Sequence, residues 1–221
     1  MIIDSRFNGP PDSGNGGYSA GMCAQLAPVG TVEVTLRKPP PLDVQLNWQE
    51  EDGVVRVFDP DGGLVAEARS TTLDPDEVVV PVSWDEAVAA SAGYPGFTTH
   101  PFPTCFVCGP ERLAGDGLRL FPGRLPDRRT ATPFTVPDQV APELIWAALD
   151  CPGGWAVPLE GRPYLLGRLT ARVDSLPAPG ERCVVMGAMT GEDGRKAYTR
   201  SSLYGADGGL LAAARATWIA I

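Results

Sequence analysis

Histidine and positive charge are both scarce in this sequence. His100 is the only histidine among 221 residues, which weakens every mechanism that needs a classical Ser-His-Asp triad or a His-rich metal site. The 18 Lys and Arg stand against 27 Asp and Glu, a formal net charge of −9. A general nucleic-acid binder needs positive charge to displace counterions, so we expect no nucleic-acid partner.

Targeting and membrane signals are also missing. The N-terminal residues, MIIDSRFNGPPDSG, have no basic start followed by an apolar run, so they predict no signal peptide. No stretch approaches the length of a membrane span, so we expect no membrane partner. The five cysteines are odd in number and scattered, which favours reduced thiols over a disulfide scaffold. Together these features predict a cytoplasmic protein.

An internal repeat is the strongest positive signal. Residues Phe58–Leu73 (FDPDGGLVAEARSTTL) and Tyr204–Ile219 (YGADGGLLAAARATWI) are identical at eight of sixteen positions, with an offset of 204 − 58 = 146 residues. Random pairing would match about one position, so the repeat predicts an internal duplication. The chain is long enough for two domains of roughly 100 residues. We therefore expect two copies packed as a pseudo-dimer, with any active site between them. Arg69 and Arg215 occupy equivalent positions in the copies and predict repeated ion pairs.

The first copy begins with a segment of small residues. Residues 13–27 predict a helix for which Ser13 or Asn15 could be the N-cap. The alternating run at 31–37 predicts a strand. Three more strands are expected after it, separated by Asp-Gly turns at 52–53 and 61–62.

The second copy has the same order of signals. Residues 142–148 (PELIWAA) predict a helix. Pro142 is tolerated at its first position, because the N–H that proline lacks has no partner within the helix there. Pro152 should kink or end this helix. Residues 164–173 predict a strand, and Asp-Gly pairs again mark hairpins at 193–194 and 207–208.

The region between the copies predicts a short helix at 84–92, and its Gly- and Pro-rich residues 93–103 predict a linker. The runs at 118–121 and 130–136 predict extra strands that open the second copy. We therefore place the first repeat at 1–92, the linker at 93–103 and the second repeat at 104–221.

This order of elements resembles the hotdog fold, in which a curved antiparallel sheet wraps a central helix. Residues 105–120 (CFVCGPERLAGDGLRL) are similar to the opening of single-hotdog acyl-CoA thioesterases of the phenylacetyl-CoA type, roughly CFxCGPxNPxGLxLxF. Residues 144–156 (LIWAALDCPGGWA) are similar to the helix pattern of that family, ILATLLDEAMGWA. Residues 16–27, the strand after them and LRKPPPL resemble the first repeat of the medium-chain acyl-CoA thioesterases, which are double hotdogs. The resemblance implies an α+β double hotdog: two curved antiparallel sheets, each wrapping a central helix, packed as a pseudo-dimer.

Asp150 falls at the acid position of this family, late in an otherwise apolar helix. A carboxylate there is costly unless it is paired or used. The resemblance implies that Asp150 activates a water, or attacks directly, at a thioester carbonyl. The alternative is an exposed helix-terminal Asp at the break made by residues 152–154.

Gly16 and Gly17 are the expected complement to Asp150. Free N–H groups at a helix start stabilise negative charge, and glycine lets a ligand approach them closely. They could therefore bind the thioester oxygen, with Asn15 as an added donor. Tight packing of the helix against the sheet explains the two glycines equally well. An apolar slot between the copies would hold the acyl chain, near Tyr18, Met22, Trp146 and Trp155.

Two features depart from the resembling families. The second helix starts with Ala141-Pro142-Glu143 where the single-hotdog family has His-Gly-Gly, so a second oxyanion site is lost and one active site per chain remains. The medium-chain family uses a Gln and a Thr beside its Asp, whereas Ala216 or Thr217 falls at the Gln position here. Glu143 remains a reserve carboxylate, although a first-turn Glu also fits the helix dipole alone.

His100, Cys105 and Cys108 could begin a zinc site. No second CxxC or HxxxH follows, so a further ligand would have to be Cys23, Cys151 or Cys183. The same CxxCG occurs in the resembling thioesterases, where it does not imply a metal. We therefore expect no metal and no other cofactor.

The leading hypothesis for the function is hydrolysis of an acyl-CoA or another acyl thioester, which would be the partner molecule. A non-catalytic protein that binds an acyl ligand or a partner, with a degraded active site, is the second hypothesis. A zinc-dependent interaction module is the third. Two double-hotdog chains could also pair as a homodimer.

Overall fold

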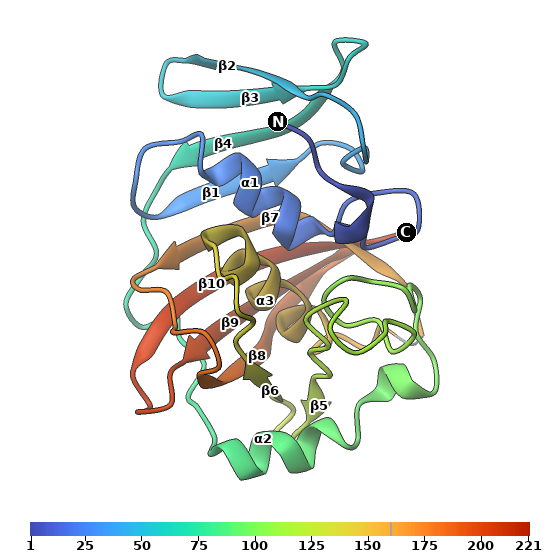
Figure 1. Ribbon diagram of the computed structural model, residues 1–221, viewed down its shortest axis with the longest axis vertical. Coiled ribbons are helices and arrows are strands. Elements are labelled where there is room, and N and C mark those ends of the chain that lie inside the picture. Colours follow the sequence, from blue (N-terminus) through green and yellow to red (C-terminus); the bar gives the residue numbers. More distant parts are fainter. Residues whose placement is uncertain (160) are drawn as a thin grey trace.

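The protein is described here by a computed structural model that covers residues 1–159 and 161–221. One antiparallel sheet of ten strands forms its centre, in the order β2-β3-β4-β1-β7-β10-β9-β8-β6-β5 (Figure 1). The strands are β1 (Val32–Leu36), β2 (Asn47–Glu51), β3 (Val54–Phe58), β4 (Leu64–Ser70), β5 (Gly123–Arg124), β6 (Thr130–Thr135), β7 (Tyr164–Val173), β8 (Arg182–Asp193), β9 (Lys196–Tyr204) and β10 (Leu210–Ala220).

The α-helices are α1 (Gly16–Ala24), α2 (Trp84–Ser91) and α3 (Pro142–Gly154), and two short 3₁₀ turns are η1 (Ser5–Phe7) and η2 (Pro95–Phe97). Helices α1 and α3 lie side by side on one face of the sheet (Figure 1). Helix α2 packs on β6 at the far end of the same sheet. None of the helices in the described part of the chain is long and apolar enough to cross a membrane.

The two sheets expected from the sequence are joined into one. Strand β1 from the first half pairs antiparallel with β7 from the second, and Val34 lies opposite Leu169 in this register. Both residues are fully buried. The joint therefore lies in the middle of the sheet, directly beneath the two central helices.

The sequence repeat corresponds to a repeated turn. The N–H of Gly62 donates to Asp59 O at 3.0 Å, and the N–H of Gly208, 146 residues later, donates to Gly205 O at 3.0 Å. Both glycines have positive φ, +80° and +81°, which residues with a side chain rarely adopt. Strands β4 and β10 follow these turns, so the repeat reflects the same hairpin built twice.

Most predicted elements are confirmed, and two expectations need correction. Residues 118–121 form no strand, and the short strand β5 begins two residues later. Within the predicted linker at 93–103, Tyr94 is buried and its hydroxyl donates to Cys108 O at 3.1 Å, whereas Phe97 is exposed. Helix α3 does not end at Pro152 but continues to Gly154.

Two hydroxyl groups of the sheet donate hydrogen bonds to backbone carbonyl oxygens of α3 at and near Pro152. The proline nitrogen has no hydrogen to donate inside the helix. The hydroxyl of Ser201 donates to Leu149 O, and the hydroxyl of Thr130 donates to Pro152 O at 2.6 Å. Gly187 on β8 lies directly below, where an added Cβ would stand 2.1 Å from Pro152 O. This contact sets how closely the end of α3 approaches the sheet.

We therefore expect Gly187→Ala to lower the free energy of unfolding by about 1–3 kcal/mol, because the new methyl group overlaps backbone rather than a flexible side chain. Gly191→Ala, on the same strand, is the matched control, since its Cβ would meet only Tyr198 at 3.9 Å. Urea denaturation of both variants measures the difference. Equal stability of the two variants would contradict the close contact between α3 and β8.

Candidate active site

The site lies where α1 and α3 touch. An added Cβ on Gly17 would stand 2.5 Å from Asp150 Cβ, and one on Gly21 would stand 2.6 Å from Glu143 Cα, so the helices run in opposite directions. The start of α1 therefore meets the end of α3. This contact needs glycine because any side chain at position 17 would push the helices apart.

Asp150 is buried at this contact, with 2% of its surface exposed. Its Oδ2 accepts hydrogen bonds from the N–H of Gly17 at 2.9 Å and from Asn15 Nδ2 at 3.2 Å. Its Oδ1 has no hydrogen-bond partner among the described residues. One carboxylate oxygen is thus fixed by the first helix, and the other is buried without a hydrogen-bond partner among the described residues.

The surroundings of Asp150 act on its pKa in opposite directions. Burial and, to a smaller extent, the nearby Cys105 raise the pKa, whereas the hydrogen bonds from Gly17 and Asn15 lower it, and the net result is a pKa of about 7. A carboxyl group with a pKa near neutrality holds a proton weakly enough to exchange it during a reaction. Asp150 is therefore suited to general acid–base chemistry.

Asn15 is the residue that caps α1, and it connects the helix to the site. Its Oδ1 accepts from the N–H of Tyr18 at 2.9 Å, as an N-cap does. Its Nδ2 donates to Asp150 and also contacts the sulfur of Cys105 at 3.8 Å. One amide side chain thus fixes the helix start, the carboxylate and the cysteine loop together.

Gly16 borders a cavity beside Asp150. An added Cβ there would stand 2.7 Å from Leu166 Cβ on β7, so close packing does require glycine. The N–H of Gly16 has no acceptor among the described residues, whereas that of Gly17 is engaged by Asp150. Gly16 is consequently the better placed of the two to donate to a ligand.

The cavity has a volume of about 60 Å³ and a mostly apolar lining. Residues far apart in the sequence surround it: Gly9, Pro10, Asn15, Gly16, His100, Pro101, Phe102, Cys105, Cys108, Asp150, Cys151, Trp155, Leu159, Tyr164, Leu165, Leu166 and Trp218. The structure thus brings together Asp150, Asn15, Gly16 and Trp155 of the expected site residues.

Three expected substrate-binding residues do not border this cavity. Tyr18 stacks on Phe7 with ring centroids 3.9 Å apart. Trp146 lines a separate hollow beside Gly21. Met22 packs against the core without reaching Asp150.

Three cysteines line the cavity, and the sequence did not predict their place there. The sulfurs of Cys105, Cys108 and Cys151 lie within 4.8 Å of one another, and all three residues are buried. Hydrogen bonds from the thiols of Cys108 and Cys151, and from the N–H groups of Cys108 and Val107, hold the pKa of Cys105 well below its usual range against the effect of burial. The CxxC spacing was visible in the sequence, but the nearness of Cys151 was not.

The remaining candidate residues have structural partners. Glu143 accepts from Gln25 Nε2 at 2.7 Å and does not border the cavity. Trp218, rather than Ala216 or Thr217, is the residue of β10 in the lining. Both repeated arginines form ion pairs, Arg69 with Glu33 at 2.6 Å and Arg215 with Glu77 at 3.1 Å.

No family model and no curated protein matches the sequence. Solved structures do match over nearly the whole chain. A candidate thioesterase from Novosphingobium aromaticivorans shares 16% identity and a TM-score of 0.62, covering 99% of this chain and 93% of its own. A protein of unknown function with a hotdog fold from Alicyclobacillus acidocaldarius shares 13% identity and a TM-score of 0.61, with coverages of 99% and 91%. An acyl-CoA thioesterase II from Mycobacterium marinum shares 12% identity and a TM-score of 0.56, with coverages of 95% and 90%. The chain therefore has the hotdog fold that its sequence resembles.

We expect Asn15→Ala to lower the free energy of unfolding by about 1–2 kcal/mol, because it removes the N-cap of α1 and one donor to a buried carboxylate. Asn15→Ser, which keeps a capping oxygen, should lose less. Chemical denaturation at one fixed pH compares the two variants with the parent. An Asn15→Ala variant as stable as the parent would show that these hydrogen bonds contribute nothing.

Proposed function

We propose that the protein hydrolyses an acyl thioester, with Asp150 as the group that removes a proton from the attacking water. The observation that carries this proposal is the buried carboxylate whose Oδ1 has no partner among the described residues, next to a largely apolar cavity. Burying a carboxylate without full hydrogen bonding costs stability, so its retention favours a chemical role. Solved hotdog structures named as thioesterases agree with this choice of reaction.

The proposed reaction uses three groups of the site. Asp150 Oδ1 takes a proton from water, and the oxygen of that water bonds to the thioester carbonyl carbon. The Gly16 N–H, with the dipole of α1, stabilises the negative charge on the carbonyl oxygen. The C–S bond then breaks, and the leaving thiolate takes the proton from Asp150. The products are a carboxylic acid and a free thiol, and water is the only other reactant.

The double-hotdog arrangement is part of the same proposal. The strand order β2-β3-β4-β1 in the first half is mirrored by β8-β9-β10-β7 in the second. We assign residues 1–92 and 104–221 to two repeats and 93–103 to the connection between them. Helix α2, which ends the first repeat, would then reach across to cover β6 of the second. In this arrangement Gly16 and Asp150 come from different repeats.

The thiol carrier we propose is CoA, because one of the solved hotdog structures is an acyl-CoA thioesterase. The basic residues Arg37 and Lys38 lie at a hollow of about 200 Å³ that shares Pro10, Gly16 and Leu166 with the site cavity. Positive charge there could accept the phosphates of CoA.

Asp150→Asn should reduce kcat/KM on the best acyl-CoA by at least about 100-fold, the usual contribution of a general base. The change keeps the size of the side chain and its acceptor oxygen. Asp138→Asn, which makes the same chemical change at an exposed position, is the control. Thiol release is followed with a chromogenic reagent on protein shown to be folded. Undiminished hydrolysis by Asp150→Asn would remove Asp150 from the mechanism.

Short acyl groups should be the better substrates. The cavity of about 60 Å³ is far smaller than the roughly 300–1,000 Å³ of sites that enclose larger ligands. A series of acyl-CoAs from acetyl to palmitoyl should therefore show kcat/KM falling as the chain lengthens. A rate that rises with chain length would place the acyl group elsewhere.

A non-catalytic acyl-binding role remains the second candidate, favoured by the composition of the site. The hydrogen bonds to Asp150 come from Gly17 and Asn15. Trp218 is the residue of β10 that borders the cavity, and Ala216 or Thr217 falls at the position of the Gln that the medium-chain family uses. Acyl-CoAs that raise the melting temperature of the protein without any thiol release would support this role. Sustained turnover would exclude it.

A further inference from the structure

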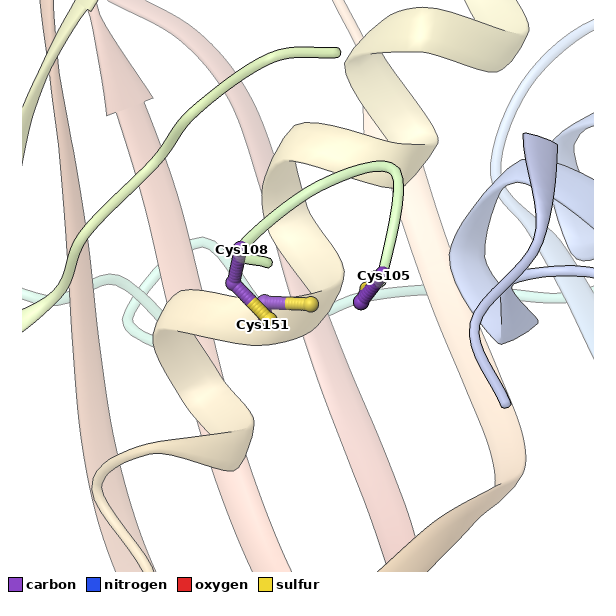
Figure 2. Close-up of side chains that lie close together, drawn as sticks. All are labelled: Cys105, Cys108 and Cys151. Atoms are coloured by element: carbon purple, nitrogen blue, oxygen red, sulfur yellow. The ribbon is translucent and has the colours of Figure 1, made fainter. Parts of the chain in front are cut away.

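Three cysteine sulfurs converge beside the site from two different segments. Cys105 and Cys108 lie on the loop that follows η2, and Cys151 lies on α3, one residue after Asp150. Figure 2 shows the loop crossing the helix so that the three side chains meet. All sulfurs lie within 4.8 Å of one another, although the segments are more than 40 residues apart in the sequence.

The loop that carries two of these cysteines lacks regular structure of its own. Residues 98–122, between η2 and β5, form only turns and irregular backbone. Irregular segments of this length are uncommon inside compact domains and are usually functional. Even so, Cys105, Phe106, Val107 and Cys108 are all buried. An irregular loop is therefore packed closely in the interior beside α3.

The CxxCG turn is shaped around the Cys105 sulfur. An added Cβ on Gly109 would stand 2.5 Å from Cys105 N, so the turn closes only with glycine. This tight turn brings Cys108 back toward Cys105, and the two sulfurs lie within 4.8 Å of each other. Asn15 Nδ2 approaches the Cys105 sulfur from α1 at 3.8 Å. A side-chain N–H donor beside a sulfur is typical of the outer partners of a metal ligand.

His100 supplies a similar donor to the second sulfur. Its Nδ1 accepts from the N–H of Phe102 at 2.9 Å, so the proton of the neutral ring is assigned to Nε2. That Nε2 lies 3.4 Å from Cys108 Sγ and donates to it. The ring is thus an outer partner of the cysteine cluster rather than one of its ligands.

We propose that Cys105, Cys108 and Cys151 bind one soft, tetrahedral divalent cation, Zn²⁺, whose fourth position is filled by a small ligand from the cavity. Zinc–sulfur bonds of about 2.3 Å place tetrahedral sulfurs about 3.8 Å apart. The sulfurs already lie within 4.8 Å, so small side-chain movements complete the site. The cation clamps the irregular loop to α3.

Charge explains the surroundings of this site. Three thiolates and Zn²⁺ carry a net charge of −1, which is costly in a buried position. The His100 Nε2–H and the Asn15 side-chain amide spread that charge through their contacts with the sulfurs of Cys108 and Cys105. The sequence has no second CxxC or HxxxH, and its CxxCG resembles that of thioesterases without metal, which is why it favoured a protein without metal.

Metal content tests the proposal directly. The whole chain is purified from zinc-supplemented cells without chelator, and zinc is measured by mass spectrometry against protein concentration. We expect about one zinc per chain in the parent and at least a tenfold loss in Cys108→Ala. Cys183→Ala is the matched control, because Cys183 is equally buried but lies outside the cluster. Its zinc content should equal that of the parent.

Cobalt substitution adds a readout that does not depend on how the variants fold. Parent protein reconstituted with Co²⁺ should show intense sulfur-to-cobalt absorption and visible bands typical of tetrahedral coordination. Parent protein with substoichiometric zinc and no such absorption would overturn the proposal, as would a disulfide found between any two of the three cysteines. Asp150→Asn should keep its zinc, so the metal site and the proposed hydrolysis can fail independently.

Discussion

The close approach of α1 and α3 is the constraint on which the site depends. Gly17 has no side chain, so its backbone can rest against Ala147 and Asp150, and its N–H reaches the buried carboxylate. A side chain at this position would separate the helices and remove the shortest hydrogen bond to Asp150. The glycines at the start of α1 are therefore required for packing, and the polar contact follows from that packing. Close packing thus accounts for both glycines, and the binding of a thioester oxygen at this helix start stays a prediction.

Only one oxygen of the carboxylate that this contact buries has hydrogen-bond partners among the described residues. Two hydrogen bonds to Oδ2 favour the ionised form, and burial opposes it more strongly, so the net effect raises the pKa to about 7. Full satisfaction of both oxygens would have stabilised the fold but left nothing for a ligand. Asn15 links this balance to the cysteine loop, because the same amide group contacts Asp150 and Cys105. The acid, the helix start and the sulfur cluster consequently form one connected unit beside a single cavity.

Local patterns in the sequence were enough to predict most of the fold and part of the site. Asp-Gly turns, alternating strands and the repeat identify the hairpins, because those features are set by residues close together in the chain. The acid in an apolar helix identifies Asp150 for the same reason. Contacts between distant segments could not be predicted from local patterns, because they depend on tertiary packing. Examples are the pairing of β1 with β7, the continuation of α3 beyond Pro152, and the nearness of Cys151 to Cys105. Tyr18, Met22 and Trp146 were expected near the acyl chain because they are apolar residues of the two predicted helices, but an apolar residue in a helix does not reveal which cavity it borders.

The contact between the helices also explains why one site forms rather than two. Asp150 is the ninth residue of α3, and the ninth residue of α1 is Ala24. At the opposite end of the helix pair, Ala24 and Gly21 meet Pro142 and Trp146 around another hollow. That hollow has no acid at the matching position, and Pro142 has no N–H to offer at its helix start. An acid without a neighbouring free N–H, or the reverse, could not both activate water and stabilise an oxyanion. Among the described residues, only the end of the helix contact that holds Asp150 therefore combines an acid at this helix position with a free N–H at the start of the neighbouring helix.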